Sequence, residues 1–311
     1  MQDDLVIDVK GLTKKFGDRK VVDNVDMQVA RGEIYGFLGP NGSGKTTTIR
    51  LLCGLLTPDA GTGTCLGHDI LTESPQIKLE VGYMTQKFSL YEDLSIRENL
   101  DFIARIYQLP DRRNAVDAAL EKLNLKARAN QLAGTLSGGW KQRLALASCI
   151  MHKPKLLLLD EPTAGVDPKA RREFWDEIHE LADDGLTVLV STHYMDEAER
   201  CHKICYLAYG KLLARGTADE VIAASHLRTW TVTATSQKQI HRLARDLGNR
   251  AGVDIVAPFG TILHVSGTDE AALINALSPY RHDAGLTWTQ DQPTLEDVFI
   301  LMMKQSADNF Q

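Results

Sequence analysis

Alternating apolar and polar positions mark the first segments of the chain as strands. Residues 5–9 and 21–29 alternate with a period of two, which predicts antiparallel strands with one buried face. Further along, residues 156–159 and 188–190 form unbroken apolar runs, which are typical of parallel strands covered on both faces. The pattern therefore predicts an α/β domain that combines a parallel core sheet with an antiparallel sheet.

Between these strands, apolar residues recur every three or four positions, as expected of helices with one buried face. The expected helices present Ile96, Leu100, Ile103 and Tyr107, then Val116, Leu120 and Leu123, and then Phe174, Ile178 and Leu181. The first of them opens with Ser95 and Glu98, three residues apart, which is the pattern of a capping box. We expect that helix to begin directly after Ser95.

The pattern changes around residues 223–228, so we expect one domain over residues 1–224 and another over residues 225–311. In the second part, the pattern of apolar positions predicts strands at residues 229–234, 253–256, 261–265 and 286–289, with helices at residues 237–247 and 269–277. That order, βαββαβ, is the order of a small α+β ferredoxin-like domain. A last helix is expected over residues 295–304, with Thr294 and Asp297 in capping positions.

Composition excludes several classes of protein. The 311-residue chain has a net charge of −6, which argues against a broad surface for nucleic acid. No apolar stretch approaches the roughly 20 residues that cross a bilayer, and the first residues lack the pattern of a secretion signal. The five cysteines form no C-x-x-C pair, which argues against a zinc or disulfide framework. We expect a soluble, cytosolic chain.

A glycine-rich segment follows the apolar residues 34–38 and precedes a helical pattern over residues 46–56. It fits G-x-x-x-x-G-K-[ST], a loop whose backbone N–H groups and following helix bind polyphosphate. The motif predicts ATP and Mg²⁺ as cofactors, with Lys45 at the β- and γ-phosphates and the Thr46 hydroxyl on the metal. The expected nucleotide contacts are Gly39, Pro40, Asn41, Gly42, Ser43, Gly44, Lys45, Thr46 and Thr47.

Two adjacent carboxylates, Asp160 and Glu161, end the apolar run at residues 156–159. Side chains at the carboxyl ends of such strands point into the ligand crevice. Asp160 suits a place in the magnesium shell, and Glu161 suits activation of the attacking water. Both carboxylates are therefore expected to take part in ATP hydrolysis.

A third motif, Leu136-Ser137-Gly138-Gly139-Trp140, precedes a helical pattern. With it the chain resembles the ATP-binding cassette (ABC) family of P-loop NTPases, whose signature is LSGGQ. In that family the signature of one subunit closes over the ATP held by the P-loop of another, so the resemblance implies a homodimer or pseudo-dimer with Ser137, Gly138 and Gly139 at the γ-phosphate. Trp140 replaces the usual glutamine, and the effect of that change stays open.

The same resemblance implies roles for four further residues. Gln86 is similar to the glutamine that binds magnesium and senses the transmembrane partner, and His193 to the switch histidine that contacts the γ-phosphate and assists hydrolysis. Asp167 matches the loop that crosses the dimer interface. Phe16 matches the aromatic residue that stacks on adenine, although packing in the core would also explain it.

Residues 83–94 and 293–299 are similar to segments of the ATPase subunits of bacterial type-2 exporters, which handle drugs and polysaccharides. The resemblance covers residues 5–223 and implies an ABC ATPase with a helical subdomain, peripheral to the cytoplasmic face of the inner membrane. Closure of its dimer would drive transport by separate transmembrane permease subunits, which we expect to dock at residues 88–109. The sequence does not identify the transported compound. For the second domain we expect a role in regulation, dimer support or partner contact.

Two rival interpretations remain open from the sequence. A soluble ABC-type ATPase acting on a ribosome or a nucleic-acid complex commonly has two cassettes, a zinc module or a coiled-coil insertion, and none of these is seen here. A regulator that binds ATP without turnover has no need of Glu161 beside Asp160. We therefore favour the exporter interpretation, with no nucleic acid as partner.

Overall fold

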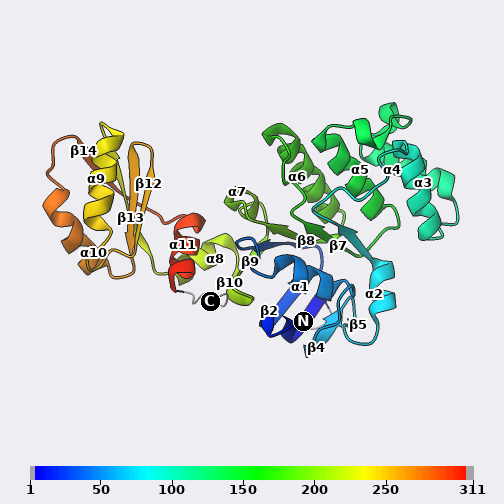
Figure 1. Cartoon of the computed structure of the whole chain (residues 1–311), viewed down its shortest axis with the longest axis horizontal. Coiled ribbons are helices and arrows are strands. Elements are labelled where there is room, and N and C mark those ends of the chain that lie inside the picture. The colour runs from blue at the N-terminus through cyan, green and yellow to red at the C-terminus, as the bar shows by residue number, and fades with distance from the viewer. Residues whose placement is uncertain (1–3, 306–311) are drawn as a thin grey trace. The chain divides into compact units, whose positions relative to one another are not determined.

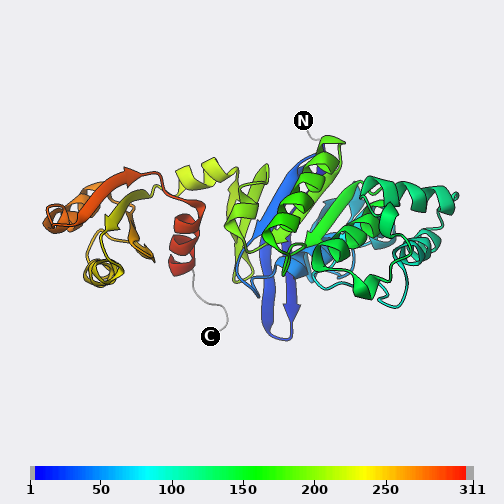
Figure 2. The same cartoon turned by 90° about the horizontal axis from the view of Figure 1, so that it is seen from above.

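The computed structural model describes residues 4–305 (Figures 1 and 2). The chain separates into two compact units that meet between Leu212 and Leu213. The domain limits at residues 224 and 225 stay a prediction from the sequence. The ends of those predicted domains, residues 1–3 and 306–311, lie outside the described residues.

The core of the first unit is a six-stranded sheet in the order β10-β9-β3-β8-β7-β6. The five strands from β9 to β6 run parallel to one another, and every residue of β3, β7 and β8 is buried. The parallel strands predicted at residues 156–159 and 188–190 are thus confirmed. The strands are β3 (Ile34–Leu38), β6 (Val81–Met84), β7 (Leu156–Asp160), β8 (Thr187–Thr192), β9 (Lys203–Ala208) and β10 (Lys211–Gly216).

A second sheet in the same unit has the order β2-β1-β4-β5 and is antiparallel. The hairpin of β1 and β2 is dark blue in Figure 2 and confirms the two alternating segments. Alternate residues of this hairpin, such as Val9 and Met27, share a buried cluster with Phe37 and Leu158 of the parallel sheet. The strands are β1 (Leu5–Phe16), β2 (Arg19–Ala30), β4 (Ala60–Cys65) and β5 (His68–Asp69).

Helices complete the first unit, and α3, α4 and α5 gather in one part of it (Figure 1), as expected of a helical subdomain. The three predicted helices are confirmed, and Ser95 and Glu98 form the capping box. The α-helices are α1 (Lys45–Leu52), α2 (Ser74–Glu80), α3 (Ile96–Ile106), α4 (Arg112–Lys122), α5 (Gly138–Ile150), α6 (Pro168–Asp183) and α7 (Met195–Ala198). Short 3₁₀ turns lie at η1 (Lys126–Arg128) and η2 (Ala133–Thr135).

The helix expected over residues 46–56 ends earlier, at Leu52, so that boundary was wrong. Gly54 has a φ of +69° and reverses the chain. The Gly54 N–H donates to Leu51 O at 3.2 Å, and the Leu55 N–H donates to Arg50 O at 2.9 Å. This pair of bonds is the Schellman arrangement that ends a helix at a left-handed glycine.

The second unit begins with the remainder of β10 and contains α8 (Ala218–Ala224), followed by the βαββαβ order predicted from the sequence. Its antiparallel sheet has the order β12-β13-β11-β14, and α9 and α10 bury their apolar residues against it. The elements are β11 (Arg228–Ala234), α9 (Gln237–Leu247), β12 (Ile255–Phe259), β13 (Ile262–Gly267), α10 (Glu270–Leu277), η3 (Ser278–Tyr280), β14 (Leu286–Asp291) and α11 (Leu295–Gln305).

The expected cap of α11 is present, because the Thr294 hydroxyl accepts from the Asp297 N–H and Asp297 accepts from the Thr294 N–H. The strand expected at residues 253–256 instead occupies Ile255–Phe259 and passes through Pro258. Because β12 is an edge strand, the missing N–H of Pro258 breaks no ladder there. Within residues 4–305, no helix combines the length and apolar content needed to cross a bilayer.

Candidate active site

The predicted phosphate loop connects β3 to α1 and has a backbone that requires glycine. The φ angles of Gly39, Gly42 and Gly44 are +149°, +81° and +105°. A Cβ atom on Gly39 would lie 2.0 Å from Leu207 O, and one on Gly44 would lie 2.4 Å from Val21 O. Strands β9 and β2 therefore press on the loop so closely that only hydrogen fits at these two positions.

Lys45, the first residue of α1, is only 4% exposed. Its Nζ donates to Gly39 O at 2.7 Å and to Pro40 O at 3.1 Å, and lies 3.5 Å from Glu161 Oε1. Burial lowers the pKa of Lys45 by penalising the ammonium, while the nearby carboxylates of Glu161 and Asp160 oppose that shift. The amine thus lies among the loop carbonyls, beside the acid expected to activate water.

The two residues predicted to share a metal ion are in contact across β7 and α1. Thr46 Oγ1 donates to Asp160 Oδ1 at 2.9 Å, and Asp160 is 3% exposed. Ser191 Oγ donates to the same oxygen at 2.7 Å and accepts from the Glu161 N–H at 2.9 Å. Sequence reasoning missed Ser191. Its place at the end of an apolar run was visible, but its pairing with Asp160 comes from the register of β7 with β8.

Glu161 is the point at which three other predicted residues meet. Gln86 Nε2 donates to its Oε2 at 3.0 Å, and His193 Nδ1 lies 3.4 Å from that oxygen. The other carboxylate oxygen faces Lys45. The backbone of Glu161 is left-handed, with φ of +46°, a conformation that non-glycine residues adopt mainly where function or packing imposes it.

A hollow of about 280 Å³ lies over the phosphate loop and has several of the predicted residues in its wall. Its lining includes Asn41, Gly42, Gly44, Lys45, Thr46, Thr47, Gln86 and Glu161. The hydroxyl of Ser43 is buried and has no hydrogen-bond partner. Because buried polar groups are normally paired, this hydroxyl fits a phosphate oxygen as its partner.

The residues around Asp160 also fit a magnesium ion. The Thr46 hydroxyl, the Asp160 carboxylate and the Gln86 amide offer the oxygen ligands that Mg²⁺ prefers. No group of three or more His, Cys, Asp or Glu side chains suited to a metal occurs in the described part of the chain. In nucleotide sites Mg²⁺ is usually held by one or two carboxylates together with the phosphates.

The signature residues do not line this hollow. Ser137 takes the N-cap position of α5, yet its side chain accepts no capping hydrogen bond, and Ser137 and Gly138 are exposed. The ring of the neighbouring Trp140 lies 4.7 Å from the Arg128 guanidinium and packs on the helical core. The motif therefore presents an unused hydroxyl and a helix N-terminus to solvent.

Two further predicted residues also lie outside the hollow. Asp167 caps α6 by accepting from the N–H groups of Lys169 and Ala170, both at 3.1 Å. Phe16 ends β1 and is 52% exposed, so the alternative that it packs in the core is wrong. An exposed ring remains available for stacking.

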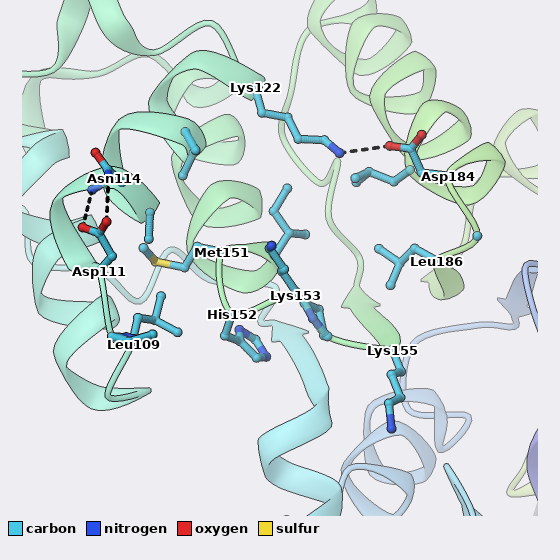
Figure 3. Close-up of a pocket in the computed structure, with 18 of the residues that line it drawn as sticks. Leu109, Asp111, Asn114, Lys122, Met151, His152, Lys153, Lys155, Asp184 and Leu186 are labelled. Carbon is cyan, nitrogen blue, oxygen red and sulfur yellow. Dashed lines mark hydrogen bonds and ion pairs between the residues drawn. The ribbon is translucent and has the colours of Figure 1, made fainter.

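A larger cavity, about 810 Å³, lies elsewhere (Figure 3). It is lined by apolar side chains such as Leu109, Met151 and Leu186, with Lys122 and Asp184 paired at 3.1 Å beside them. Loops that precede β7 and β8 form part of its wall, so it opens at the amino ends of those strands. It includes none of the predicted site residues, and size alone would therefore have misplaced the active site.

Comparison with known proteins agrees with this geometry. The family described as ABC transporter matches residues 22–164, which include the phosphate loop, the signature and both adjacent carboxylates. The daunorubicin resistance ATP-binding protein DrrA3 of Streptomyces coeruleorubidus is 35% identical over 312 residues, covering 96% of this chain and 95% of that protein. The chain belongs to the ABC transporter ATP-binding family.

Two further matches cover about 70% of the chain. The probable multidrug ABC transporter ATP-binding protein YbhF of Escherichia coli K12 is 48% identical over 222 residues, or 71% of this chain, but the match spans only 38% of YbhF. The ATP-binding cassette MJ0796, solved as a dimer bound to ADP and Pi, aligns with a TM-score of 0.62 at 28% identity, covering 68% of this chain and 98% of MJ0796. The first unit is therefore an ABC ATPase cassette.

Proposed function

We propose that this ABC protein is the ATP-hydrolysing subunit of an exporter and acts as a head-to-tail dimer. The observation that carries the proposal is the convergence of Lys45, Gln86 and His193 on Glu161, beside the pair of Thr46 and Asp160. The names of its relatives, a multidrug transporter protein for YbhF and a daunorubicin resistance protein for DrrA3, support export as the task. They also favour a transporter over a ribosome-bound or nucleic-acid-bound ATPase.

ATP binding would use groups that are free or easily released in the structure. The buried Ser43 hydroxyl and the loop N–H groups would bind phosphate oxygens, and the Lys45 amine would exchange its loop carbonyls for the β- and γ-phosphates. Thr46, Asp160 and Gln86 would hold Mg²⁺. When bound, that ion neutralises charge on the phosphates.

Hydrolysis would depend on the Glu161 carboxylate as general base for water. Turning Lys45 towards the phosphates would free Glu161 Oε1, which now faces the amine at 3.5 Å. His193, 3.4 Å from the other oxygen, would hold the carboxylate in place and contact the γ-phosphate. A positioned general base contributes about 10²–10⁴-fold to such a reaction.

The second copy would supply the missing side of the site. Ser137 is exposed and leaves its hydroxyl unused at the N-terminus of α5, where a helix favours anions. The Asp167 loop, at the N-terminus of α6, would lie along the same interface. The dimeric, post-hydrolysis form of MJ0796 supports such an assembly.

Permease subunits would dock on the segment that follows Gln86. A groove of about 320 Å³ there has Tyr83, Tyr91, Phe102 and Tyr107 among its lining residues. Tyr91 and Phe102 are 51% and 37% exposed and meet edge to face at 5.2 Å. Exposed aromatic rings are typical of protein interfaces, so this groove suits a short cytoplasmic segment of a membrane subunit. The chain would then lie on the cytoplasmic face of the inner membrane.

Substitution of Glu161 by Gln tests the proposal. We expect Glu161→Gln to slow phosphate release by at least about 100-fold, because the general base is lost, while MgATP still binds. The ATP-bound dimer should then accumulate in size-exclusion chromatography with MgATP. Glu180→Gln, an equal change of charge on an exposed residue of α6, is the control and should hydrolyse ATP normally. Wild-type turnover by Glu161→Gln would refute the assigned role.

A further inference from the structure

Glu197 is a fully buried carboxylate in α7 that none of the motifs includes. Thr163 Oγ1 donates to its Oε1, and Thr192 Oγ1 donates to its Oε2 at 2.5 Å. Both threonines are also buried, at 2% and 1% exposure. One side chain thus bonds to two segments at once, the loop after β7 through Oε1 and the last residue of β8 through Oε2.

These two segments carry Glu161 and His193, the pair of residues proposed to act in hydrolysis. Thr163 lies two residues after Glu161, on the segment that follows β7, and Thr192 directly precedes His193 at the end of β8. The members of that pair meet through their side chains, with His193 Nδ1 lying 3.4 Å from Glu161 Oε2. Glu197 connects the segment of Glu161 to the segment of His193 by accepting hydrogen bonds from Thr163 and Thr192.

Arg171 of α6 adds a second connection to the same carboxylate. Its Nε lies 3.6 Å from Glu197 Oε1, and its guanidinium lies 4.2 Å from the centre of the Tyr194 ring. The Tyr194 ring in turn lies 4.1 Å from the His193 ring. Contacts from Glu197 therefore reach His193 from both sides, through Thr192 before it and through Arg171 and Tyr194 after it.

We propose that Glu197 is a positioning residue for ATP hydrolysis, which sets the distance and orientation between Glu161 and His193. This inference rests on the proposed hydrolytic function. A buried ionised group is costly unless it is fully paired, so a residue needed only for packing would be better apolar. Misplacement of reacting groups by about 1 Å can cost about 10²-fold in rate, so loosening this connection should act on the chemical step.

Single-turnover hydrolysis of MgATP by the purified full chain tests the inference. Thr192→Val and Glu197→Ala should each lower the rate constant at saturating MgATP by at least about 10-fold. The Kd of MgATP should change little, because the phosphate loop is untouched. Glu197→Gln keeps the shape of the side chain and can still bond both hydroxyls, and should recover much of the rate.

Thr187→Val is the matched control. Thr187 is equally buried at the other end of β8, where its hydroxyl accepts from the Gly32 N–H at 3.0 Å. Its loss should destabilise the fold to a similar extent and leave the hydrolysis rate unchanged. If Glu197→Ala does not fold, the comparison of Thr192→Val with Thr187→Val decides the question.

A double-mutant cycle with His193→Ala separates positioning from general stability. If Glu197 acts through His193, Glu197→Ala should add little to the loss already caused by His193→Ala. Wild-type rates in Thr192→Val and Glu197→Ala, or independent losses that multiply in the double variant, would overturn the inference. A wild-type chain without any hydrolysis would instead refute the proposed function.

Discussion

At the scale of single residues, the phosphate loop is shaped by its neighbours as much as by its own sequence. Gly39 faces the carbonyl of Leu207, and Gly44 faces that of Val21, in strands far away along the chain. These contacts accompany positive φ angles at both glycines, and Lys45 is buried at the end of the loop. The loop therefore lies between a strand of the parallel sheet and a strand of the antiparallel sheet.

Gly39→Ala tests whether the phosphate loop needs the close approach of the Leu207 carbonyl. The new Cβ would lie 2.0 Å from a backbone oxygen and 2.9 Å from Ser43 Oγ, so the loop must move. We expect the Kd of MgATP to rise at least about 10-fold and the free energy of unfolding to fall by more than about 1 kcal/mol. Nucleotide titration and urea denaturation measure the two effects.

Gly32→Ala is the control for backbone strain alone. Gly32 also has a positive φ, +73°, but a methyl group added there would meet no atom within 4 Å. It should lose about 1 kcal/mol of stability and bind MgATP as the wild type does. If Gly39→Ala binds MgATP with the same Kd as the wild type, the phosphate loop tolerates the movement that the added methyl group forces.

At the scale of elements, two helices begin in the same way and differ in what the first residue does. Ser95 before α3 and Ser137 before α5 have nearly the same backbone angles, with φ of −68° and −67°. The Ser95 hydroxyl accepts from the Glu98 N–H, whereas the Ser137 side chain makes no capping bond. The first serine thus stabilises its helix, whereas the second leaves its hydroxyl without a capping bond, as the proposed contact with ATP requires.

Replacing each serine by alanine should separate these roles. Ser95→Ala should lower the free energy of unfolding by about 1 kcal/mol through loss of the cap. Ser137→Ala should unfold at the same urea concentration as the wild type but lose ATP-driven dimer formation, measured by size-exclusion chromatography. A marked loss of stability in Ser137→Ala would contradict the idea that its hydroxyl is held in reserve.

At the scale of the whole molecule, the phosphate loop and the signature do not line the same hollow. The hollow over the phosphate loop contains Lys45 and Glu161, but none of the signature residues. Ser137 and Gly138 lie exposed at the N-terminus of α5. In the proposed head-to-tail dimer, a complete site would need two copies, or one copy and a related subunit.

Mixed dimers of two inactive variants test that requirement. Lys45→Ala damages the phosphate loop and Ser137→Ala damages the signature, so each homodimer should lack hydrolysis. A heterodimer purified through two different tags has one site made of two intact halves, and should regain hydrolysis at that site. A heterodimer as inactive as its parents would show that the sites are not shared between copies.

Local pattern was sufficient for most of the fold. Continuous apolar runs determined β7 and β8, alternation determined β1 and β2, and capping residues set the starts of α3 and α11, because these signals depend on near neighbours. The errors occurred at boundaries. The end of α1 depended on Gly54, and β12 could pass through Pro258 only because it lies at the edge of its sheet.

The sequence by itself determined the family and the chemistry, since the phosphate loop, the signature and the pair Asp160 and Glu161 are each contiguous. Only the tertiary structure decided which distant groups act with them. Ser191 reaches Asp160 through strand register, and Glu197 joins the loops of Glu161 and His193 through buried hydrogen bonds. Such partners depend on how strands align and pack, and no spacing along the chain encodes that alignment locally.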